Sequence, residues 1–179
     1  MSRGHLFLLA IFAALAITWL LTFEQGQQDD TAPLTIEDDY HLDDFKLAAF
    51  DHDGNMTHRV TGSALRQLSG SHDFKLEDPH FILLSDPGHW DITARSAWMD
   101  AAMTRAELRG GIVATGKARD DLTLTTSDLA LDLSRKLATT DALVNIMQGD
   151  NRLRGEALTA NLQTHRLRLR HNIEGYYAP

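Results

Sequence analysis

The stretch Leu129-Ala-Leu-Asp-Leu133 decides the fold, because its leucines occupy every second position. Such alternation puts one face of a β-strand in an apolar core and the other in water. The pattern recurs as Leu158-Thr-Ala-Asn-Leu162, and a short turn follows each copy, the first being Ser134-Arg135-Lys136. The segment from Ala97 to Asp100 has a similar spacing to its own turn but is poorer in leucine. We interpret the unit as a β-hairpin that the chain uses more than once.

The same alternation extends outward from these hairpins, over about Leu34 to Tyr177, without a comparable helical stripe. Turn signals divide it into short strands. These turn signals are Asp53-Gly54-Asn55, Asp86-Pro87-Gly88, Arg109-Gly110-Gly111 and Gly149-Asp150-Asn151. Stacked hairpins bury a continuous apolar interior and leave strand edges open at the ends of the stack. We therefore predict one all-β domain over residues 35–179, an elongated, twisted β-sandwich or β-roll.

A segment of different character precedes this domain. Leu6 to Phe23 carries no charge, and it would rise about 27 Å as a helix, close to the roughly 30 Å hydrocarbon core of a bilayer. The alternative is a cleaved signal peptide, but Trp19 and Leu20 stand where a cleavage site needs small residues. We predict a transmembrane helix over residues 6–23, behind a short cytoplasmic terminus (1–5) and before a periplasmic linker (24–34).

Charge gives the orientation and limits the partners. Arg3 precedes the apolar segment and Glu24 follows it, so the positive side stays in the cytoplasm and the bulk of the chain faces outward. In a Gram-negative cell that space is the periplasm, and the absence of cysteine from the 179 residues rules out disulfides and thiolate metal sites. A net charge of -8 argues against a nucleic-acid partner.

Candidate catalytic and metal-binding motifs are weak. Asp51 to Asn55 is rich in oxygen ligands, but counting from Asp51 its glycine comes fourth, and Gly62 occupies the place where a calcium loop needs a glutamate. We predict a hairpin turn there. The histidines show no paired ligand spacing, and no nucleophile, base and orienting acid occur together. We predict no catalytic residue, no metal and no cofactor, and a binding protein rather than an enzyme.

Arg166, Arg168 and Arg170 alternate with leucines, which puts all three guanidinium groups on one face of a strand. One interpretation is a charged edge that discourages aggregation. The other is a docking surface for an acidic partner or a phosphorylated headgroup. The first is favoured, because a single basic strand in an acidic protein is a common edge device.

Several motifs, in their order after an uncleaved anchor, resemble the LptC family, the bitopic component of the lipopolysaccharide export machine. The resemblance covers essentially the whole chain and is carried by the apolar segment, Asp53-Gly54, Trp90-Asp-Ile-Thr-Ala94, Leu108-Arg-Gly-Gly-Ile-Val113, Thr139-Thr-Asp-Ala-Leu-Val144 and Arg154-Gly155. One departure is Arg95, where the family often has an acid after the alanine of the tryptophan motif.

The resemblance implies a β-jellyroll like that of the bridge protein LptA, on an inner-membrane anchor. It implies that lipopolysaccharide passes from an ABC transporter, whose transmembrane subunits are LptF and LptG and whose ATPase is LptB, to LptA in the periplasm. Under that reading the ligand would lie in an apolar groove lined by Phe81, Leu83, Trp90, Ile92, Leu129, Leu131, Leu133, Leu158 and Leu162. The same residues would equally fill a closed core, because alternation alone does not separate the two.

Open strand edges are the expected docking surfaces, because an exposed strand can add a strand from another protein. The candidate residues are Leu167, Leu169 and Tyr176 for the outward partner and Tyr40 and Phe45 for the transporter. The rival function is a membrane-tethered scaffold that docks envelope proteins without carrying lipid.

Overall fold

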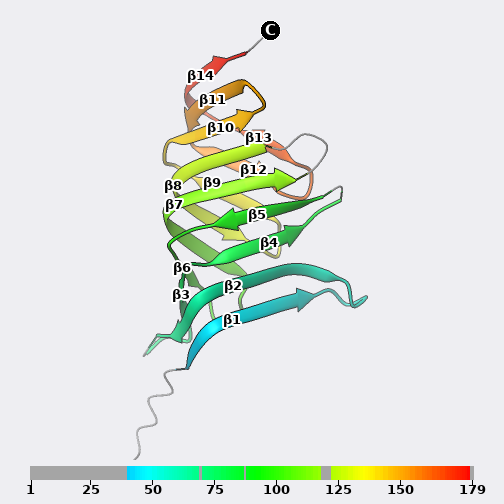
Figure 1. Cartoon of the computed structure of the whole chain (residues 1–179), viewed down its shortest axis with the longest axis vertical. Helices are drawn as coiled ribbons and strands as arrows, with labels where there is room; N and C mark the ends of the chain where they lie inside the picture. The colour runs from blue at the N-terminus through cyan, green and yellow to red at the C-terminus, as the bar shows by residue number, and fades with distance from the viewer. Residues whose placement is uncertain (1–39, 69, 87, 118–121, 178–179) are drawn as a thin grey trace, which may run out of the picture. The chain divides into compact units, whose positions relative to one another are not determined.

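In the computed structural model, the described residues are 40–68, 70–86, 88–117 and 122–177. The predicted cytoplasmic terminus, transmembrane helix and linker all lie outside these ranges, and within them no helix is long and apolar enough to cross a bilayer. The described part forms a 14-stranded antiparallel sheet (Figure 1), which confirms the all-β prediction. The strands are β1 His41–Phe50, β2 Met56–Gln67, β3 Phe74–Glu77, β4 His80–Leu84, β5 His89–Thr93, β6 Ser96–Met99, β7 Arg105–Lys117, β8 Leu122–Asp132, β9 Leu137–Thr140, β10 Val144–Gln148, β11 Asn151–Glu156, β12 Leu158–Asn161, β13 Arg166–Arg168 and β14 His171–Tyr176.

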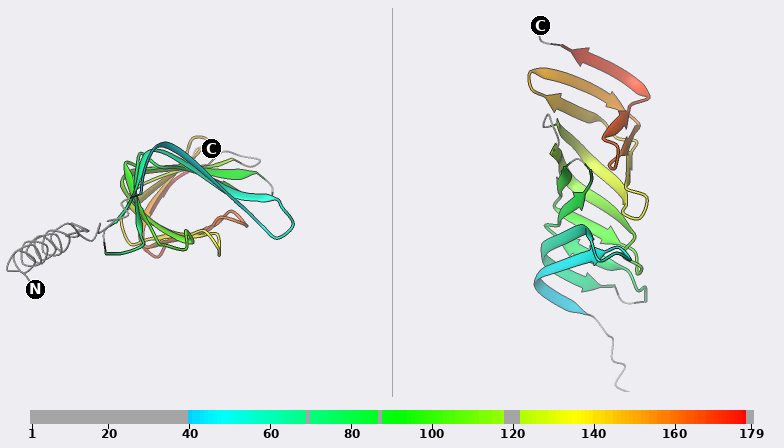
Figure 2. Two further views of the ribbon diagram at one scale, coloured as in Figure 1. Left: turned by 90° about the horizontal axis from the view of Figure 1, so that it is seen from below. Right: turned by 90° about the vertical axis from the view of Figure 1, so that its right-hand side faces the viewer.

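This single sheet is folded over into two facing layers. The first half of β2 pairs with β4 and its second half with β3, and β8 likewise divides its length between β10 and β9. We call the layer that contains β4, β5, β10, β11 and β14 the β4 layer, and the layer that contains β3, β6, β9, β12 and β13 the β9 layer. Figure 2 shows the layers converging on the side where strands pass from one to the other. We call that side the fold line and the opposite side the seam.

Glycine and bulges produce the bend at the fold line. Gly110 and Gly111 have φ of 90° and 82°, and the pairing of β7 with β8 shifts register between Arg109 and Ile112. The prediction of a turn at Arg109-Gly110-Gly111 was therefore wrong. The glycines let β7 bulge and bend without reversing direction, because a positive φ is a property of both bulges and turns.

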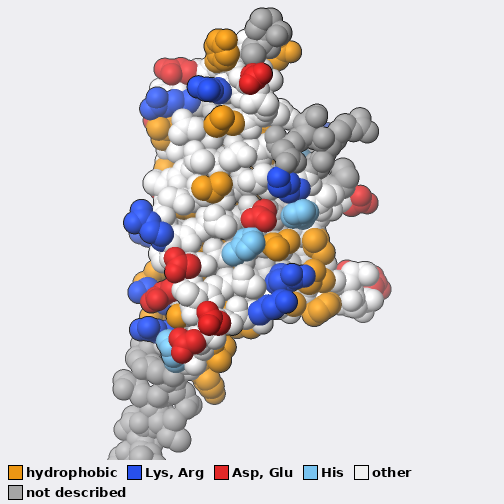
Figure 3. Space-filling model, in the orientation of Figure 1, with side chains coloured by type: hydrophobic (Ala, Val, Ile, Leu, Met, Phe, Trp, Pro, Cys, Tyr) orange, Lys and Arg blue, Asp and Glu red, His pale blue; other side chains and the backbone are white. Residues whose placement is uncertain are grey.

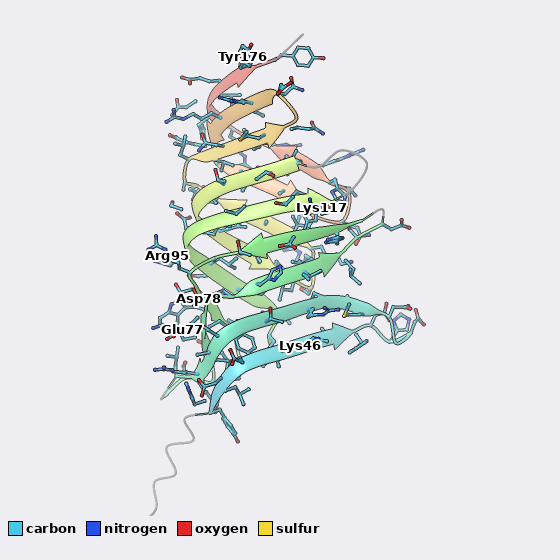
Figure 4. All side chains as sticks on the ribbon, viewed as in Figure 1. Lys46, Glu77, Asp78, Arg95, Lys117 and Tyr176 are labelled. Atoms are coloured by element: carbon cyan, nitrogen blue, oxygen red, sulfur yellow. The ribbon has the colours of Figure 1, made fainter. Side chains whose placement is uncertain are left out.

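Arg95 occupies the same side of the domain. Its Nε donates a hydrogen bond to the Gly110 carbonyl at 2.9 Å, and its own carbonyl accepts one from the Asp78 N–H at 2.9 Å. Figure 4 shows Asp78 and Arg95 next to each other where the strands bend. The residue that departs from the family pattern thus holds neighbouring strands together at the fold line.

The turns of the β9 layer confirm the predicted hairpin repeat. Leu133–Lys136 is the turn between β8 and β9, and Leu162–His165 is the turn between β12 and β13. The Leu162 N–H donates to the Lys136 carbonyl at 2.8 Å, and the Leu133 N–H donates to the Thr104 carbonyl at 2.8 Å. Equivalent hairpins therefore stack with a regular backbone contact, and the leucine-poor copy at Ala97–Asp100 belongs to the same stack.

Aspartates hold two of these turns. Burial opposes ionisation of the Asp100 carboxyl, but hydrogen bonds from the N–H groups of Arg105 and Thr104 and from the Thr104 hydroxyl outweigh it and lower its pKa. Hydrogen bonds from the Ser134 hydroxyl and the Arg135 N–H lower the pKa of Asp132.

The predicted turn at Asp53-Gly54-Asn55 is also confirmed, since Asp51 accepts the N–H groups of Asp53 and Asn55 at 3.0 and 2.9 Å.

The core lies between the layers, as the alternation predicted. Every predicted groove residue belongs to one buried cluster, and each is at most 4% exposed. Burying one such leucine or phenylalanine stabilises a fold by about 1.5–3 kcal/mol. These side chains pack against one another in this structure. A groove between them would therefore form only where the two layers move apart.

Candidate functional site

Side-chain contacts between the two layers close the seam. The turn between β4 and β5 faces the turns that follow β8 and β12, and Lys136 Nζ donates a hydrogen bond to the Leu84 carbonyl at 2.8 Å. The Ser85 Oγ and the His165 Nε2 lie 2.9 Å apart and share a hydrogen bond. Among the described strands, β4 and β5 form no ladder with β9, β12 or β13. Side chains therefore join the two layers at the seam, whereas strands that run through both layers join them at the fold line.

Trp90 on β5 completes the closure. Its Nε1 donates to the Leu162 carbonyl at 3.0 Å, and its ring stacks on His165 with centroids 5.4 Å apart and an interplanar angle of 20°. Gly116 on β7 leaves room for the ring, because a Cβ there would lie 3.1 Å from the indole. Trp90 was predicted to line a groove, and the structure places it as a bridge between the layers.

One hollow opens on the seam toward β1. We call it the β1-end hollow; it encloses about 350 Å³ between β1 and β2 on one side and the turns of the β9 layer on the other. Its lining is largely apolar and includes Leu47, Phe50, Val60, Met103, Leu133 and Lys136. His58 also lines it, and burial, followed by the nearby Lys136 ammonium, lowers the pKa of this histidine.

A second hollow opens at the other end of the core. We call it the β14-end hollow; it encloses about 450 Å³ and lies among β8, β10, β11, β13 and β14. Its apolar lining includes Leu122, Ile146, Leu153, Leu167, Leu169 and Tyr176. The bridge made by Trp90, Lys136 and His165 therefore has an apolar hollow on either side of it along the seam.

Unpaired strand edges occur at both ends of the described sheet. β1 pairs only with β2, β13 only with β12 and β14 only with β11. Tyr40 is 61% exposed and Tyr176 is 64% exposed, and Figure 3 shows apolar side chains on the surface at the level of β1 and at the level of β14. These ends have the character of docking edges.

The predicted docking residues divide into exposed and buried ones. Leu167 and Leu169 are partly buried against the core. Phe45 is 5% exposed, and a Cβ on Gly62 would meet its ring at 2.6 Å. A partner cannot reach this side chain, because alternation along β1 turns it inward. The large apolar side chains that β1 does expose are Leu42 and Phe50.

The arginine face lies where the alternation predicted. Arg166, Arg168 and Arg170 are exposed, and Leu167 and Leu169 between them are partly buried. Arg166 and Arg168 lie on the terminal strand β13, and Arg170 comes just after it. The charged edge that was favoured from the sequence fits this position.

Sequence reasoning missed the seam residues. Lys136 and His165 each occupy the third position after the last leucine of a repeat copy, so aligning the copies would have shown them as equivalent. Nothing in the sequence around Ser85 indicates that its hydroxyl contacts His165, which lies 80 positions later in the chain.

The match to a family model agrees with the resemblance. The family model described as lipopolysaccharide-assembly, LptC-related, matches residues 6–178. Among solved structures, the chain is similar to LptH of Pseudomonas aeruginosa, described as the LptA homologous periplasmic component of the lipopolysaccharide transport device. The identity is 11%, the TM-score is 0.46, and the match covers 78% of this chain and 94% of that one. No curated protein matches. Because the family match spans almost the whole sequence, the chain belongs to the LptC-related family and has a role in lipopolysaccharide transport.

Proposed function

We propose that this chain binds lipopolysaccharide with its acyl chains between the two layers and relays it across the periplasm. The observation that carries the proposal is the pair of apolar hollows at the two ends of one inter-layer core. Acyl chains cannot cross water exposed, because each buried methylene contributes about 0.8 kcal/mol. An apolar interior that is reached from both ends suits a ligand that enters at one end and leaves at the other.

The ends of the sheet are the proposed docking points. The β1 edge, with Tyr40 and Leu42 exposed, would meet the transmembrane subunits LptF and LptG of the transporter, and the β14 edge, with Tyr176, would meet the bridge protein LptA. Strand addition at these edges would continue the sheet from one protein into the next. The apolar interior would then continue across each joint, so that the acyl chains stay out of water.

Residues 6–23 would anchor the chain in the inner membrane, with residues 1–5 in the cytoplasm and the β-domain in the periplasm. The chain would act as a carrier, not a catalyst. Its sequence lacks the G-x-x-x-x-G-K-[ST] loop of ATPases, so the energy for transport would come from LptB.

Site-specific photocrosslinking tests the proposal in the full-length chain in membranes. A photoreactive residue at Leu47 in the β1-end hollow or at Leu167 in the β14-end hollow should form adducts with lipopolysaccharide. Val113 is the matched control, because it is apolar but 41% exposed on the outer face of β7. Equal labelling from Val113 and from the hollows would contradict an internal path.

A scaffold that docks envelope proteins without carrying lipid is the second candidate. It is favoured by the tight packing of the predicted groove residues, each at most 4% exposed. The two functions differ in the uptake of an apolar fluorescent probe. A carrier should bind the probe and lose it when lipopolysaccharide is added, whereas a scaffold with a closed core should bind little in either case.

A further inference from the structure

The two hollows are separated by a small set of side-chain contacts. Lys136 lines the β1-end hollow and also reaches Leu84 across the seam. On the other side, Leu167 lines the β14-end hollow and stands two positions after His165, which contacts Ser85 and Trp90. A chain of methylenes that moved from one hollow to the other along the seam would meet these contacts.

The contacts come from equivalent positions of the repeat. Lys136 and His165 have φ of 51° and 52°, a left-handed conformation that is uncommon for residues other than glycine. Strain of this kind persists only where the surroundings fix it, and it concentrates at functional sites and switch regions. In both residues the strained backbone belongs to a turn on the seam, and both side chains reach the β4 layer.

We propose that Lys136, His165 and Trp90, with their acceptors on the facing turns, form a latch that divides the groove and must open for acyl chains to pass between the hollows. This rests on the proposed function and adds a regulated barrier to the same site. The layers stay joined at the fold line while the latch is open, because β2, β7 and β8 run through both layers.

The contacts suit a reversible gate. Each is a single hydrogen bond or a ring stack, and the net contribution of one hydrogen bond corresponds to roughly a tenfold change in an equilibrium. Removing one contact should therefore raise the open fraction of the seam by about tenfold and leave the fold line intact.

The first test needs no ligand. The chain has no cysteine, so a single introduced thiol reports when the interior is exposed. Ala160→Cys reports near the seam, because Ala160 lies just before the turn that carries His165 and is 1% exposed. Ala97→Cys reports near the fold line, where Ala97 is 0% exposed. Thiol labelling rates are measured in the full-length chain with each reporter alone and with His165→Ala or Lys136→Met added.

We expect both latch substitutions to raise labelling at residue 160 by about tenfold and to leave labelling at residue 97 unchanged. Arg135→Met is the matched control for Lys136→Met, because Arg135 is an exposed neighbour in the same turn. Unchanged rates at residue 160 would overturn the latch, and so would equal increases at the two reporters, which would indicate general loss of stability.

The second test locks the seam. Ser85→Cys and His165→Cys are joined by a short, reducible thiol crosslinker in the full-length chain, and purified lipopolysaccharide is then captured by a photoreactive residue at Leu131 or Leu47. Locking should lower capture at Leu131 by at least about tenfold, with recovery after reduction, and should spare capture at Leu47 in the hollow. A crosslinked pair on the outer face, Glu107→Cys with Ala130→Cys, is the control, because these residues are exposed partners on β7 and β8.

The outcomes separate the latch from the carrier function. Equal capture at Leu131 with the seam locked and unlocked would overturn the latch but leave lipid binding standing. Failure of the unlocked chain to capture lipopolysaccharide at either position would overturn the proposed function. In that event the ligand-free labelling rates still decide whether the latch exists.

Discussion

The fold line and the seam join the same two layers by different means. At the fold line the layers share backbone, since β2 pairs with strands of both layers and the glycine bulge of β7 allows its bend. At the seam they share hydrogen bonds of 2.8 to 3.0 Å and one ring stack. Damage to the fold line should therefore unfold the domain, whereas damage to the seam should let the layers part.

The largest effect is expected for Gly62→Ala, at the bend of β2. The new Cβ would lie 2.6 Å from the Phe45 ring and 2.7 Å from the Glu77 carbonyl oxygen, and the backbone there has little freedom to move away. We expect a loss of about 3 kcal/mol in unfolding free energy, as for overpacking of a tight core, measured by chemical denaturation.

Gly175→Ala is the matched control for that substitution. It makes the same change in β14, where the nearest atom would be an ordinary 3.4 Å away, and it should be nearly neutral. Similar losses for both variants would contradict crowding at the bend as the cause, because removing a glycine where a Cβ fits restricts the unfolded chain and should not destabilise the fold.

Trp90→Phe should have a smaller effect, concentrated at the seam. Phenylalanine keeps most of the buried apolar area but loses the hydrogen bond to the Leu162 carbonyl. A lost partner for a buried acceptor costs about 2 kcal/mol, and the seam thiol at residue 160 should label faster. Trp98→Phe on β6, where the ring is 46% exposed, should change neither quantity. An equal or larger loss of unfolding free energy in Trp98→Phe would contradict the assignment of the Trp90 effect to its hydrogen bond at the seam.

The difference between the two sides also explains what could be predicted from the sequence. Alternation in Leu129–Leu133 and Leu158–Leu162 predicted which side chains face the core, because period two depends only on local geometry. The same rule turns Phe45 inward, so its assignment as a docking residue did not follow the alternation. Gly110-Gly111 was predicted as a turn, because positive φ serves both a reversal and a bulge and only the pairing of the neighbouring strands separates them.

The seam was beyond local reasoning for a different reason. The contact between Ser85 and His165 joins residues 80 positions apart, and it depends on how many bent strands lie between them. Sequence patterns fix which face a residue occupies, but the stacking of successive hairpins fixes which turn it meets. A candidate groove could therefore be predicted from alternation, whereas its latch could be seen only in the folded arrangement.

The smallest expected effect is a pH dependence that originates at the seam. Burial, and then the Lys136 ammonium, lower the pKa of His58 on β2, so the folded chain accepts this proton less readily than the unfolded chain. Stability from this group is complete above the ordinary histidine pKa of about 6.5 and falls as the pH decreases through the lower, folded value. Because the added charge lies beside Lys136 of the other layer, acidification from pH 7.5 to 5.5 should also raise labelling at residue 160 relative to labelling at residue 97. The ratio is the measure, because acid lowers the thiolate fraction and so slows the labelling of every thiol. Lys136→Met should weaken this response by removing one of its two causes, and His58→Gln should abolish it; a response that persists in His58→Gln would assign the pH dependence to another group.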